Sequence, residues 1–339
     1  MTVRVAVDAT SVTSTGKGIA RVARSTAAAL AEHGLDVTGL AQAGVQLRPP
    51  TETVRARPAV LWEQVGLARA GRRFDVVLTF TERLPIVRGG RFVVWLYELP
   101  ARRIDANRGA GLYQRGSDLL TRALWKRSLR RAWRVAAGSE TTARELRAAL
   151  PDVDVRVVYP GLDERFSPGE GRGGDRYVLH LGSADPRDNT ATVLRAFRAV
   201  RHRISEPLRL LVAGGATGDS TDGVEFLGRV SDDELVALYR GAAAYVDAAV
   251  YEGFGYQPLE AMACGAPVVA SNATSSPEVA GDAALLVDPL DAEALAAALV
   301  RVLEEPALVE DLRRKGFERA RGFTWERTAD ALVELIEGR

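Results

Sequence analysis

The sequence predicts an α/β protein built from two doubly wound, parallel-sheet domains. Three observations lead to this prediction. The chain has 339 residues, and a typical domain has roughly 150. Short β-branched runs alternate with longer Ala/Leu/Arg-rich helical stretches. The alternation breaks once, at 160–175, where five glycines and two prolines indicate a linker, and then restarts. Two such halves would bind a ligand in a cleft between them, beyond the carboxyl ends of the strands.

The first half shows strand and helix patterns in alternation. The expected elements, in order, are strand Val3–Val7, helix Ile19–Glu32, strands Val76–Phe80 and Phe92–Leu96, helix Ser117–Ala132, strand Val135–Ala137, helix Glu140–Leu150 and strand Val155–Tyr159. The alternation of strands and helices restarts in the second half after the break. Its expected strands are Tyr177–Leu181, Leu208–Ala213, Val224–Leu227, Ala244–Asp247, Val268–Ser271 and Ala283–Val287, and its expected helices are Ala191–Arg203, Asp232–Arg240, Pro258–Ala263 and three that start near Asp291, Pro306 and Thr324.

The formal net charge of +1 hides two halves of opposite sign. Residues 1–160 contain 26 Lys and Arg against 14 Asp and Glu, whereas residues 161–339 contain 19 against 30. Such fields influence partners and encounter rates rather than the fold. The basic half therefore predicts an anionic or membrane-associated partner on its side.

Composition excludes several classes of protein. Cys264 is the single cysteine, so no intramolecular disulfide and no cysteine-rich zinc site is expected. The first residues lack a signal-peptide pattern, and no stretch approaches the roughly 20 apolar residues that span a bilayer. We therefore expect a soluble, cytoplasmic protein. No nucleic-acid-binding motif is present, so no nucleic-acid partner is expected.

The residues that indicate chemistry are concentrated in 251–270. A strand leads into the loop Glu252-Gly253-Phe254-Gly255, and a helix is expected to begin near Pro258. Glycines let backbone N–H groups approach a ligand, and a helix N-terminus attracts an anion. Glu260 is expected in the first helical turn, where its carboxylate can accept hydrogen bonds from a diol. This pattern is suited to a polyol phosphate, although a tight turn with a capping glutamate would have the same spacing.

The segment 252–271, E-G-F-G-Y-Q-P-L-E-A-M-A-C-G-A-P-V-V-A-S, resembles the signature of the family 4 retaining glycosyltransferases, which have the GT-B fold. Other segments resemble further family patterns in the same order. These are the opening 5–22, the element Trp62-Glu63-Gln64 with Leu67 and Arg69 (similar to a mannosyltransferase-like branch), and segments 181–197, 226–246 and 323–329.

The resemblance implies two Rossmann-like domains that face a central cleft. Residues 1–160 would bind the acceptor, 161–323 would bind a nucleotide sugar, and a helix at 324–339 would pack back toward the first domain. Glu252 would contact the donor sugar near the reacting face and act as the catalytic residue. Further donor-binding positions implied by the resemblance are Gly253, Phe254, Gly255, Glu260, Gly182, Gly228, Arg229, Gly16 and Gly18.

Three positions depart from the family pattern. Ser183 and Asp188 stand where many members carry an Arg and a Lys that neutralise the diphosphate, so Arg187 or Arg229 would have to replace them. Tyr97-Glu98-Leu99 stands in place of the usual H-D-L, so Tyr97 replaces a histidine on the acceptor and sugar side, with Glu98 beside it.

Residues 101–134 contain ten basic and two acidic residues. Six of the cations crowd one expected helix beside Trp125 and Leu129. Such a helix can lie on an anionic membrane or attract an acidic acceptor. An ordinary solvated helix face with a buried Trp/Leu stripe fits the pattern equally well.

Other patterns are weaker. Residues 16–21 resemble a dinucleotide fingerprint without its last glycine. Asp152-Val153-Asp154 has the D-x-D form of a metal site, but a polar turn is the favoured interpretation. We expect no metal requirement. Among the histidines, His180 lies near the predicted cleft, but none is placed as a general base.

The sequence thus predicts a metal-independent retaining glycosyltransferase that needs no cofactor beyond its nucleotide-sugar co-substrate, with GDP-mannose favoured by the branch resemblance. The acceptor would be a glycan, a lipid or a small molecule, and peripheral contact with the inner face of the membrane is an option. Two alternatives stay open: a catalytically silent GT-B partner protein, and a GT-B sugar-nucleotide epimerase.

Overall fold

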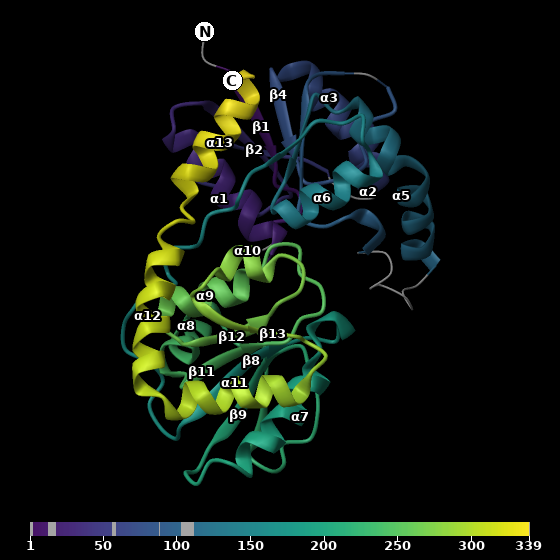
Figure 1. The fold of residues 1–339 in the computed structure, drawn as a ribbon. Coiled ribbons are helices and arrows are strands. Elements are labelled where there is room, and N and C mark those ends of the chain that lie inside the picture. The colour runs from purple at the N-terminus through teal and green to yellow at the C-terminus, as the bar shows by residue number, and fades with distance from the viewer. Residues whose placement is uncertain (1–2, 13–17, 56–58, 88, 103–111, 339) are drawn as a thin grey trace. The chain divides into compact units, whose positions relative to one another are not determined.

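The computed structural model describes residues 3–12, 18–55, 59–87, 89–102 and 112–338. The chain divides into two compact units (Figure 1). Unit 1 comprises residues 1–161 together with 324–339, and unit 2 comprises 162–323. Each unit is described below by itself.

Unit 1 is built on a seven-stranded sheet in the order β3-β2-β1-β4-β5-β6-β7. Its strands are β1 (Arg4–Asp8), β2 (Asp36–Ala41), β3 (Thr51–Thr53), β4 (Val76–Thr79), β5 (Phe92–Leu96), β6 (Arg134–Ala137) and β7 (Val155–Val157). Every neighbouring pair in the described sheet is parallel. The central strands β1, β4 and β5 are almost wholly buried and apolar, as expected of a parallel sheet covered on both faces.

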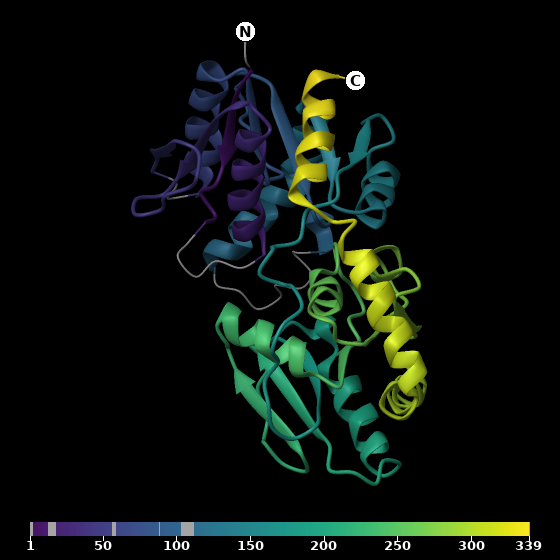
Figure 2. The same cartoon turned by 90° about the vertical axis from the view of Figure 1, so that its left-hand side faces the viewer.

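Helices cover both faces of this sheet. They are α1 (Ile19–Glu32), α2 (Ala59–Leu61), a π-helix (Trp62–Gly66), α3 (Leu67–Arg73), α5 (Leu112–Arg131), α6 (Glu140–Ala149) and α13 (Trp325–Glu337). The last helix, α13, packs beside α1 although about 300 residues separate them (Figure 2, yellow and purple). His33 lies 3.6 Å from Asp330, and Thr328 Oγ1 donates to the Tyr159 carbonyl at 2.8 Å. These contacts make α13 part of unit 1.

Unit 2 has a six-stranded parallel sheet in the order β10-β9-β8-β11-β12-β13. Its strands are β8 (Tyr177–Gly182), β9 (Arg209–Gly214), β10 (Val224–Gly228), β11 (Ala244–Asp247), β12 (Val268–Ser271) and β13 (Ala284–Val287). Its helices are a 3₁₀ turn (Pro186–Asp188), α7 (Thr190–Arg201), α8 (Asp232–Gly241), α9 (Tyr256–Cys264), α10 (Ser276–Ala280), α11 (Ala292–Glu304) and α12 (Pro306–Ala320). A large apolar core joins α7 and α11 to one face of the sheet, around the fully buried Phe197.

Most expected elements are confirmed to within a few residues. The helices expected from Asp291 and Thr324 begin immediately after these residues, whose side chains accept hydrogen bonds from the first turns. Strands β2 and β3 escaped prediction, since β2 (DVTGLA) carries a glycine and β3 has only three residues. The segment 59–73 also forms an unpredicted helical run that includes the π-helix.

The linker interpretation of 160–175 is wrong for most of that segment. The chain passes from unit 1 to unit 2 at 161/162, and 162–175 packs on unit 2. Phe166 is buried edge-on against Tyr239, and the Arg172 amide donates to the Ala237 carbonyl. A Cβ at Gly171 would lie 2.5 Å from the Gly241 nitrogen, so this glycine serves close backbone packing rather than flexibility.

Candidate functional site

The predicted donor loops follow neighbouring strands of unit 2. The order β10-β9-β8-β11-β12-β13 reverses direction between β8 and β11. In an open parallel sheet, the carboxyl edge at such a switch point is where ligands bind. Residues 182–189 follow β8, and 248–255 follow β11. The sheet therefore brings two predicted segments, about 65 residues apart in sequence, to one place.

The backbone of Glu252 is hydrogen-bonded on both sides to the loop after β12. The Glu252 amide donates to Thr274 Oγ1 at 3.0 Å, and Ser275 Oγ donates to the Glu252 carbonyl at 2.8 Å. Thr274 and Ser275 come from the loop after β12. Neither residue was predicted, because hydroxyl residues in a loop give no sequence signal until strand order brings the loops together.

Phe254 anchors the same loop. Its ring is 3% exposed, and it packs edge-on against Tyr256 at 4.9 Å and Phe323 at 5.7 Å between ring centroids. Gly255 has φ of 95°, a left-handed conformation that suits glycine, and precedes α9. The Phe254 side chain thus belongs to the protein interior, and only the backbone of 253–255 is suited to approach a ligand.

Helix α9 begins two residues earlier than expected. It starts at Tyr256, so Pro258 is the third helical residue and Glu260 the fifth. The placement of Glu260 in the first turn is therefore wrong, and the helix dipole acts on it more weakly, because that effect fades beyond the first turn. Glu260 is 5% exposed, and Tyr239 Oη on α8 donates to its Oε2 at 3.4 Å. Burial and the Glu260 charge raise the pKa of Tyr239 well above its ordinary value, so the phenol stays protonated as a donor.

The turn after β8 is tightly packed around Gly182. A Cβ there would lie 2.5 Å from Thr190 Oγ1 and 3.1 Å from His180 Nε2. His180 is buried, with Nδ1 3.0 Å from the Val246 carbonyl and Nε2 3.0 Å from Thr190 Oγ1. Because a carbonyl only accepts, the ring proton lies on Nδ1. Burial lowers the pKa of His180, so the neutral ring ties β8 to β11 and α7.

The predicted cation Arg187 has a carboxylate partner. Its Nη2 lies 2.7 Å from Asp185 Oδ2, and its guanidinium lies 5.8 Å from the centre of the Tyr251 ring. Burial opposes ionisation of Asp185, but the hydrogen bonds from Arg187 outweigh it and lower the pKa of this carboxyl. On the same turn, Asp188 Oδ2 accepts from the Ser183 amide at 2.7 Å. This ion pair between Arg187 and Asp185 was not predicted from the sequence.

The remaining donor-side residues lie at the sheet edge. Gly228 ends the edge strand β10, at a register shift, with φ of 68°. Arg229 follows it and is exposed. Both lie on the carboxyl edge, but β9 and β8 separate β10 from β11.

The predicted residues of unit 1 lie after β1 and β5. Gly18 precedes α1 with φ of 62°, whereas Gly16 lies outside the described residues. The Tyr97 ring packs against Trp95 at 5.2 Å and over Gly138, where a Cβ would lie 2.8 Å away. Glu98 beside it is half-buried. Their roles toward acceptor and sugar stay predictions.

The D-x-D pattern forms a surface turn. Asp152 pairs with Arg130 at 2.7 Å, and Asp154 with Arg156 at 3.4 Å. Within the described part of the chain, no three His, Cys, Asp or Glu side chains gather as metal ligands. Among the described helices, none has both the length and the apolar character needed to cross a bilayer.

Asp247 is an unpredicted buried carboxyl at the same switch point. It ends β11 and is 2% exposed. Its Oδ1 accepts from the Ala249 amide at 2.9 Å, whereas Oδ2 is buried without a hydrogen-bond partner among the described residues. Burial is the main reason that the pKa of Asp247 rises to about 6. No sequence motif marked this residue.

The raised pKa of Asp247 predicts that the folded state becomes less stable as the pH rises. The folded state keeps the Asp247 proton between the unfolded pKa of 3.8 and about 6, so this group lowers the free energy of unfolding as pH rises through that window. The total cost is roughly 3 kcal/mol. Asp247→Asn should therefore be more stable than wild type, by roughly 1 kcal/mol more at pH 7.5 than at pH 5. Urea unfolding at both pH values measures the difference, and an advantage independent of pH would contradict the prediction.

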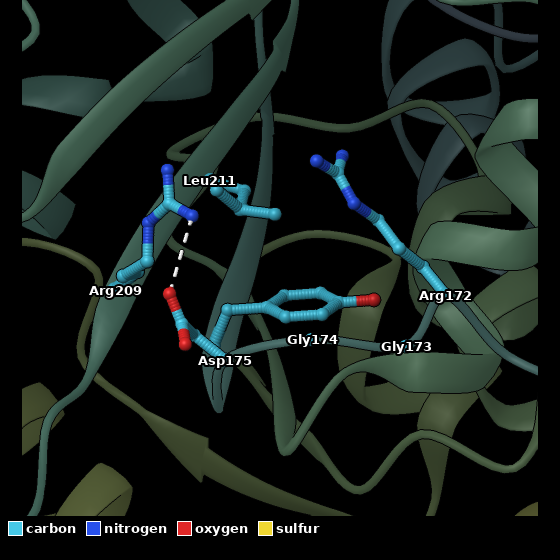
Figure 3. Close-up of a pocket in the computed structure, with 7 residues that line it drawn as sticks. Arg172, Gly173, Gly174, Asp175, Arg209 and Leu211 are labelled. Carbon is cyan, nitrogen blue, oxygen red and sulfur yellow. Dashed lines mark ion pairs between the residues drawn. The ribbon is translucent and has the colours of Figure 1, made fainter.

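A small cavity of about 200 Å³ lies at the opposite edge of the unit 2 sheet (Figure 3). Its walls include the first residues of β8 and β9, Tyr177 and Arg209. Arg209 lies 3.6 Å from Asp175 and also pairs with Glu225. Because it lies at the amino-terminal edge of the sheet, far from the carboxyl edge, this cavity is not part of the candidate site.

Two family models match the chain. Residues 16–166 match the model described as Glycosyltransferase Family 4, and residues 175–305 match the one described as Glycosyl transferases group 1. Both are glycosyltransferase models, so the chain is similar to glycosyltransferase family 4 in its first half and to the group 1 glycosyl transferases in its second half. The first match covers most of unit 1 and ends five residues past the crossing at 161/162, whereas the second lies within unit 2.

Similar proteins extend the comparison. The chain is 38% identical over 162 residues to the O-antigen chain mannosyltransferase B of Escherichia coli, a match covering 44% of this chain and 42% of that one. The chain thus spans under half the length of this relative. Among solved structures, sucrose-phosphate synthase from Thermosynechococcus elongatus aligns with a TM-score of 0.77 at 21% identity, over 99% of this chain and 98% of that one. Anabaena Alr3699/HepE in complex with UDP-glucose aligns with a TM-score of 0.75 at 15% identity, over 99% and 100%. The likeness shows the GT-B fold, with its two Rossmann-like domains.

Proposed function

We propose that this chain is a family 4 glycosyltransferase, which transfers a sugar from a nucleotide-sugar donor to a hydroxyl of an acceptor, with retention of anomeric configuration and without a metal or another cofactor. Unit 2 binds the donor and unit 1 the acceptor. The observation that carries the proposal is the clamped loop 252–255 at the switch point of unit 2. The residues just before it contact the turn 182–189, since the Val250 amide donates to the Arg187 carbonyl at 2.8 Å. GDP-mannose is the favoured donor, since a mannosyltransferase is among the relatives.

The chemistry follows from these groups. The sugar–phosphate bond breaks and the sugar–acceptor bond forms on the same face. The departing phosphate oxygen takes the acceptor proton, so no strong protein base is needed. Glu252 contacts the sugar hydroxyls near the reacting carbon, and the backbone amides of 253–255 stabilise the charge that develops on the diphosphate. Glu260 accepts hydrogen bonds from the ribose hydroxyls.

The diphosphate charge requires a cation. Arg187 is the cation of the turn after β8, and its contact with Asp185 holds it beside Tyr251. In our proposal Arg187 exchanges this carboxylate for the diphosphate, and Arg229 contributes from the end of β10. This substitution compensates for Ser183 and Asp188, where many family members carry cations.

A donor screen tests the proposed activity. The purified chain is incubated with GDP-mannose, UDP-glucose and related nucleotide sugars, with and without simple glycoside acceptors and with EDTA in parallel. Release of nucleoside diphosphate and a retained anomeric configuration in the product are expected. Absence of turnover with every donor, or abolition by EDTA, would contradict the proposal.

The ion pair between Arg187 and Asp185 also favours a second candidate function, a catalytically silent partner protein. Asp185 and Asp188 place two carboxylates where the diphosphate would lie. Calorimetry with GDP, UDP and ADP separates the two candidates, because a catalytically competent transferase must bind at least one of them.

Unit 1 presents a basic helix face to solvent. On α5 the exposed residues Arg122, Lys126, Arg127 and Arg130 recur at helical spacing, while Trp125 and Leu129 are buried in the core. The apolar stripe of 101–134 thus faces the protein, and residues 103–111 lie outside the described part. We propose that the exposed cations hold the protein at an anionic membrane surface, at the cytoplasmic face.

Vesicle binding tests this contact. The triple variant R122Q/K126Q/R127Q should bind phosphatidylglycerol vesicles roughly 10- to 100-fold more weakly, since each cation near the surface contributes about 1 kcal/mol. Wild-type binding should fall between 0.05 and 0.5 M salt. The control R313Q/R314Q/K315Q removes the same charge from α12. Equal losses in the two triple variants, or binding insensitive to salt, would contradict a specific role for α5.

A further inference from the structure

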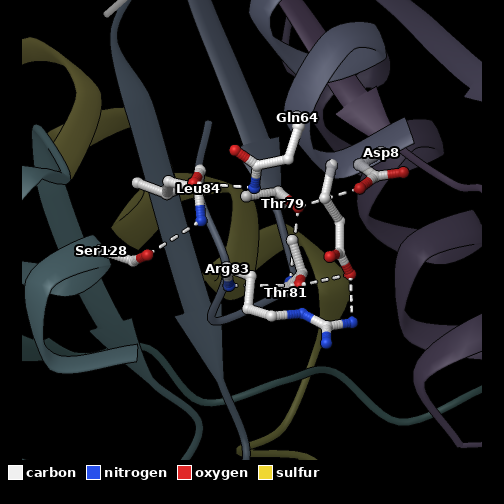
Figure 4. A network of polar contacts seen from close by, with 8 residues as sticks. Asp8, Gln64, Thr79, Thr81, Arg83, Leu84 and Ser128 are labelled. Carbon is white, nitrogen blue, oxygen red and sulfur yellow. Dashed lines mark hydrogen bonds and ion pairs between the residues drawn. The ribbon is translucent and has the colours of Figure 1, made fainter. Parts of the chain in front are cut away.

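Unit 1 has its own switch point, and polar residues surround it. The order β3-β2-β1-β4-β5-β6-β7 reverses between β1 and β4. Asp8 ends β1 and Thr79 ends β4, and Thr79 Oγ1 donates to Asp8 Oδ2 at 2.9 Å (Figure 4). Thr10 donates to Asp8 Oδ1 through its amide and its hydroxyl, at 3.2 and 2.7 Å. Both Asp8 oxygens are thus occupied, so this carboxyl holds the two strand ends together.

Next to it lies a buried ion pair. Arg83 Nη2 is 2.7 Å from Glu63 Oε1, and the two side chains are 9% and 8% exposed. Thr81 Oγ1 lies 3.5 Å from the same oxygen. The second oxygen, Oε2, is buried and has no hydrogen-bond partner among the described residues. An acceptor left unsatisfied in this way is costly, so a group that donates to Oε2 would be bound favourably.

The protein holds Glu63 in place from several sides. It lies in the π-helix Trp62–Gly66, a rare conformation often found at functional sites. Gln64 accepts from the Ile86 amide at 2.9 Å. The Leu84 amide donates to Ser128 Oγ at 3.2 Å, and Gln64 Nε2 donates to the Leu84 carbonyl at 3.4 Å (Figure 4). These bonds fix the segment that carries Arg83.

The local charge selects the kind of ligand. Counted over the whole residue, Asp8, Glu63 and Glu82 are 7%, 6% and 2% exposed. Arg83, at 7%, is the cation of this group. Burial, together with the charges of Glu82 and Asp8, outweighs Arg83 and raises the pKa of Glu63. A phosphate or carboxylate would meet repulsion here. A hydroxyl both donates and accepts, so neighbouring hydroxyls match a carboxylate beside a guanidinium.

We propose that Glu63 and Arg83 bind adjacent hydroxyls on a neutral sugar end of the acceptor, with Glu63 Oε2 accepting from one hydroxyl and Arg83 donating to the other. This inference rests on the proposed function, in which unit 1 binds the acceptor, and it narrows the class of acceptor. Any anionic part of the acceptor lies away from Glu63, toward the basic surface of α5. Sequence analysis assigned Glu63 and Arg83 no role.

Saturation-transfer NMR tests the inference without turnover. The probes are the methyl α-glycosides of mannose, glucose and galactose, and the 6-phosphates of the same sugars. At least one neutral glycoside should bind the wild-type chain more tightly than its phosphate counterpart. Glu63→Gln should weaken that binding at least fivefold. The matched control Glu52→Gln, which removes a half-buried carboxylate from a 2.7 Å pair with Arg73 in the same unit, should leave it unchanged.

A second variant covers the case in which Glu63→Gln does not fold, because it leaves Arg83 buried without its partner. E63Q/R83Q removes both charges and should lose glycoside binding to the same extent. Stronger binding of the phosphates, no binding of any neutral glycoside, or unchanged affinity in the folded variant would overturn the inference. Donor cleavage by the wild-type chain is measured separately, so a failure of the proposed activity is distinguished from a failure at Glu63.

Discussion

Replacing Glu252 by glutamine or alanine is expected to lower turnover about 100- to 1,000-fold, the loss typical when a preorganised group that stabilises a transition state is removed. The donor KM should change little, because the proposed contact strengthens as the sugar–phosphate bond breaks. The loop should keep its shape, since its hydrogen bonds to Thr274 and Ser275 use the Glu252 backbone.

The measurement is steady-state release of nucleoside diphosphate at saturating donor, with thermal unfolding as a check on folding. Glu304→Gln, an exposed carboxylate on α11, is the matched control and should behave as wild type. Turnover of Glu252→Gln within a factor of three of wild type would remove Glu252 from the catalytic role.

Replacing Glu260 by alanine should raise the dissociation constant for the nucleotide about 10- to 100-fold, because a hydrogen bond to a charged group contributes about 1.5–3 kcal/mol. Turnover at saturating donor should be largely retained, since the ribose hydroxyls are remote from the reacting carbon. Calorimetry with the nucleoside diphosphate measures the change.

The control separates a ligand contact from a structural role. Tyr239→Phe removes the 3.4 Å hydrogen bond to Glu260 but keeps the buried ring. If Glu260 binds ribose, Tyr239→Phe should change nucleotide affinity less than threefold. Equal losses in Glu260→Ala and Tyr239→Phe would indicate that Glu260 acts through packing of α8 on α9.

Much of the fold follows from local patterns. Apolar β-branched runs such as Phe92–Leu96 coincide with buried strands, because a strand of a covered parallel sheet is apolar on both faces. The capping residues Asp291 and Thr324 marked helix starts, since their side chains accept from the first-turn amides. The start of α9 was misplaced: Pro258 was expected to begin the helix, but Gly255 with its left-handed backbone precedes it and Tyr256 is its first residue.

The candidate site was only partly predictable. Glu252 and Glu260 stand in a contiguous motif that sequence alone can show. The sequence shows Asp185 two residues before Arg187. Whether a charged side chain pairs with its neighbour or binds a ligand, however, depends on the fold around it. Asp247 carries no motif, and its raised pKa comes from burial at the end of β11.

The sequence by itself determined the two-unit α/β plan, the positions of most helices and strands, and the loop 252–255, because each depends on residues close together in the chain. Tertiary structure alone decided which loops meet. Strand order brings 182–189 to 248–255 in unit 2, and Asp8 to Thr79 in unit 1, although about 65 and 71 residues separate them. It likewise buries Glu63 against Arg83 and leaves Oε2 without a hydrogen-bond partner among the described residues, because desolvation and hydrogen-bond partners are set by neighbours in space.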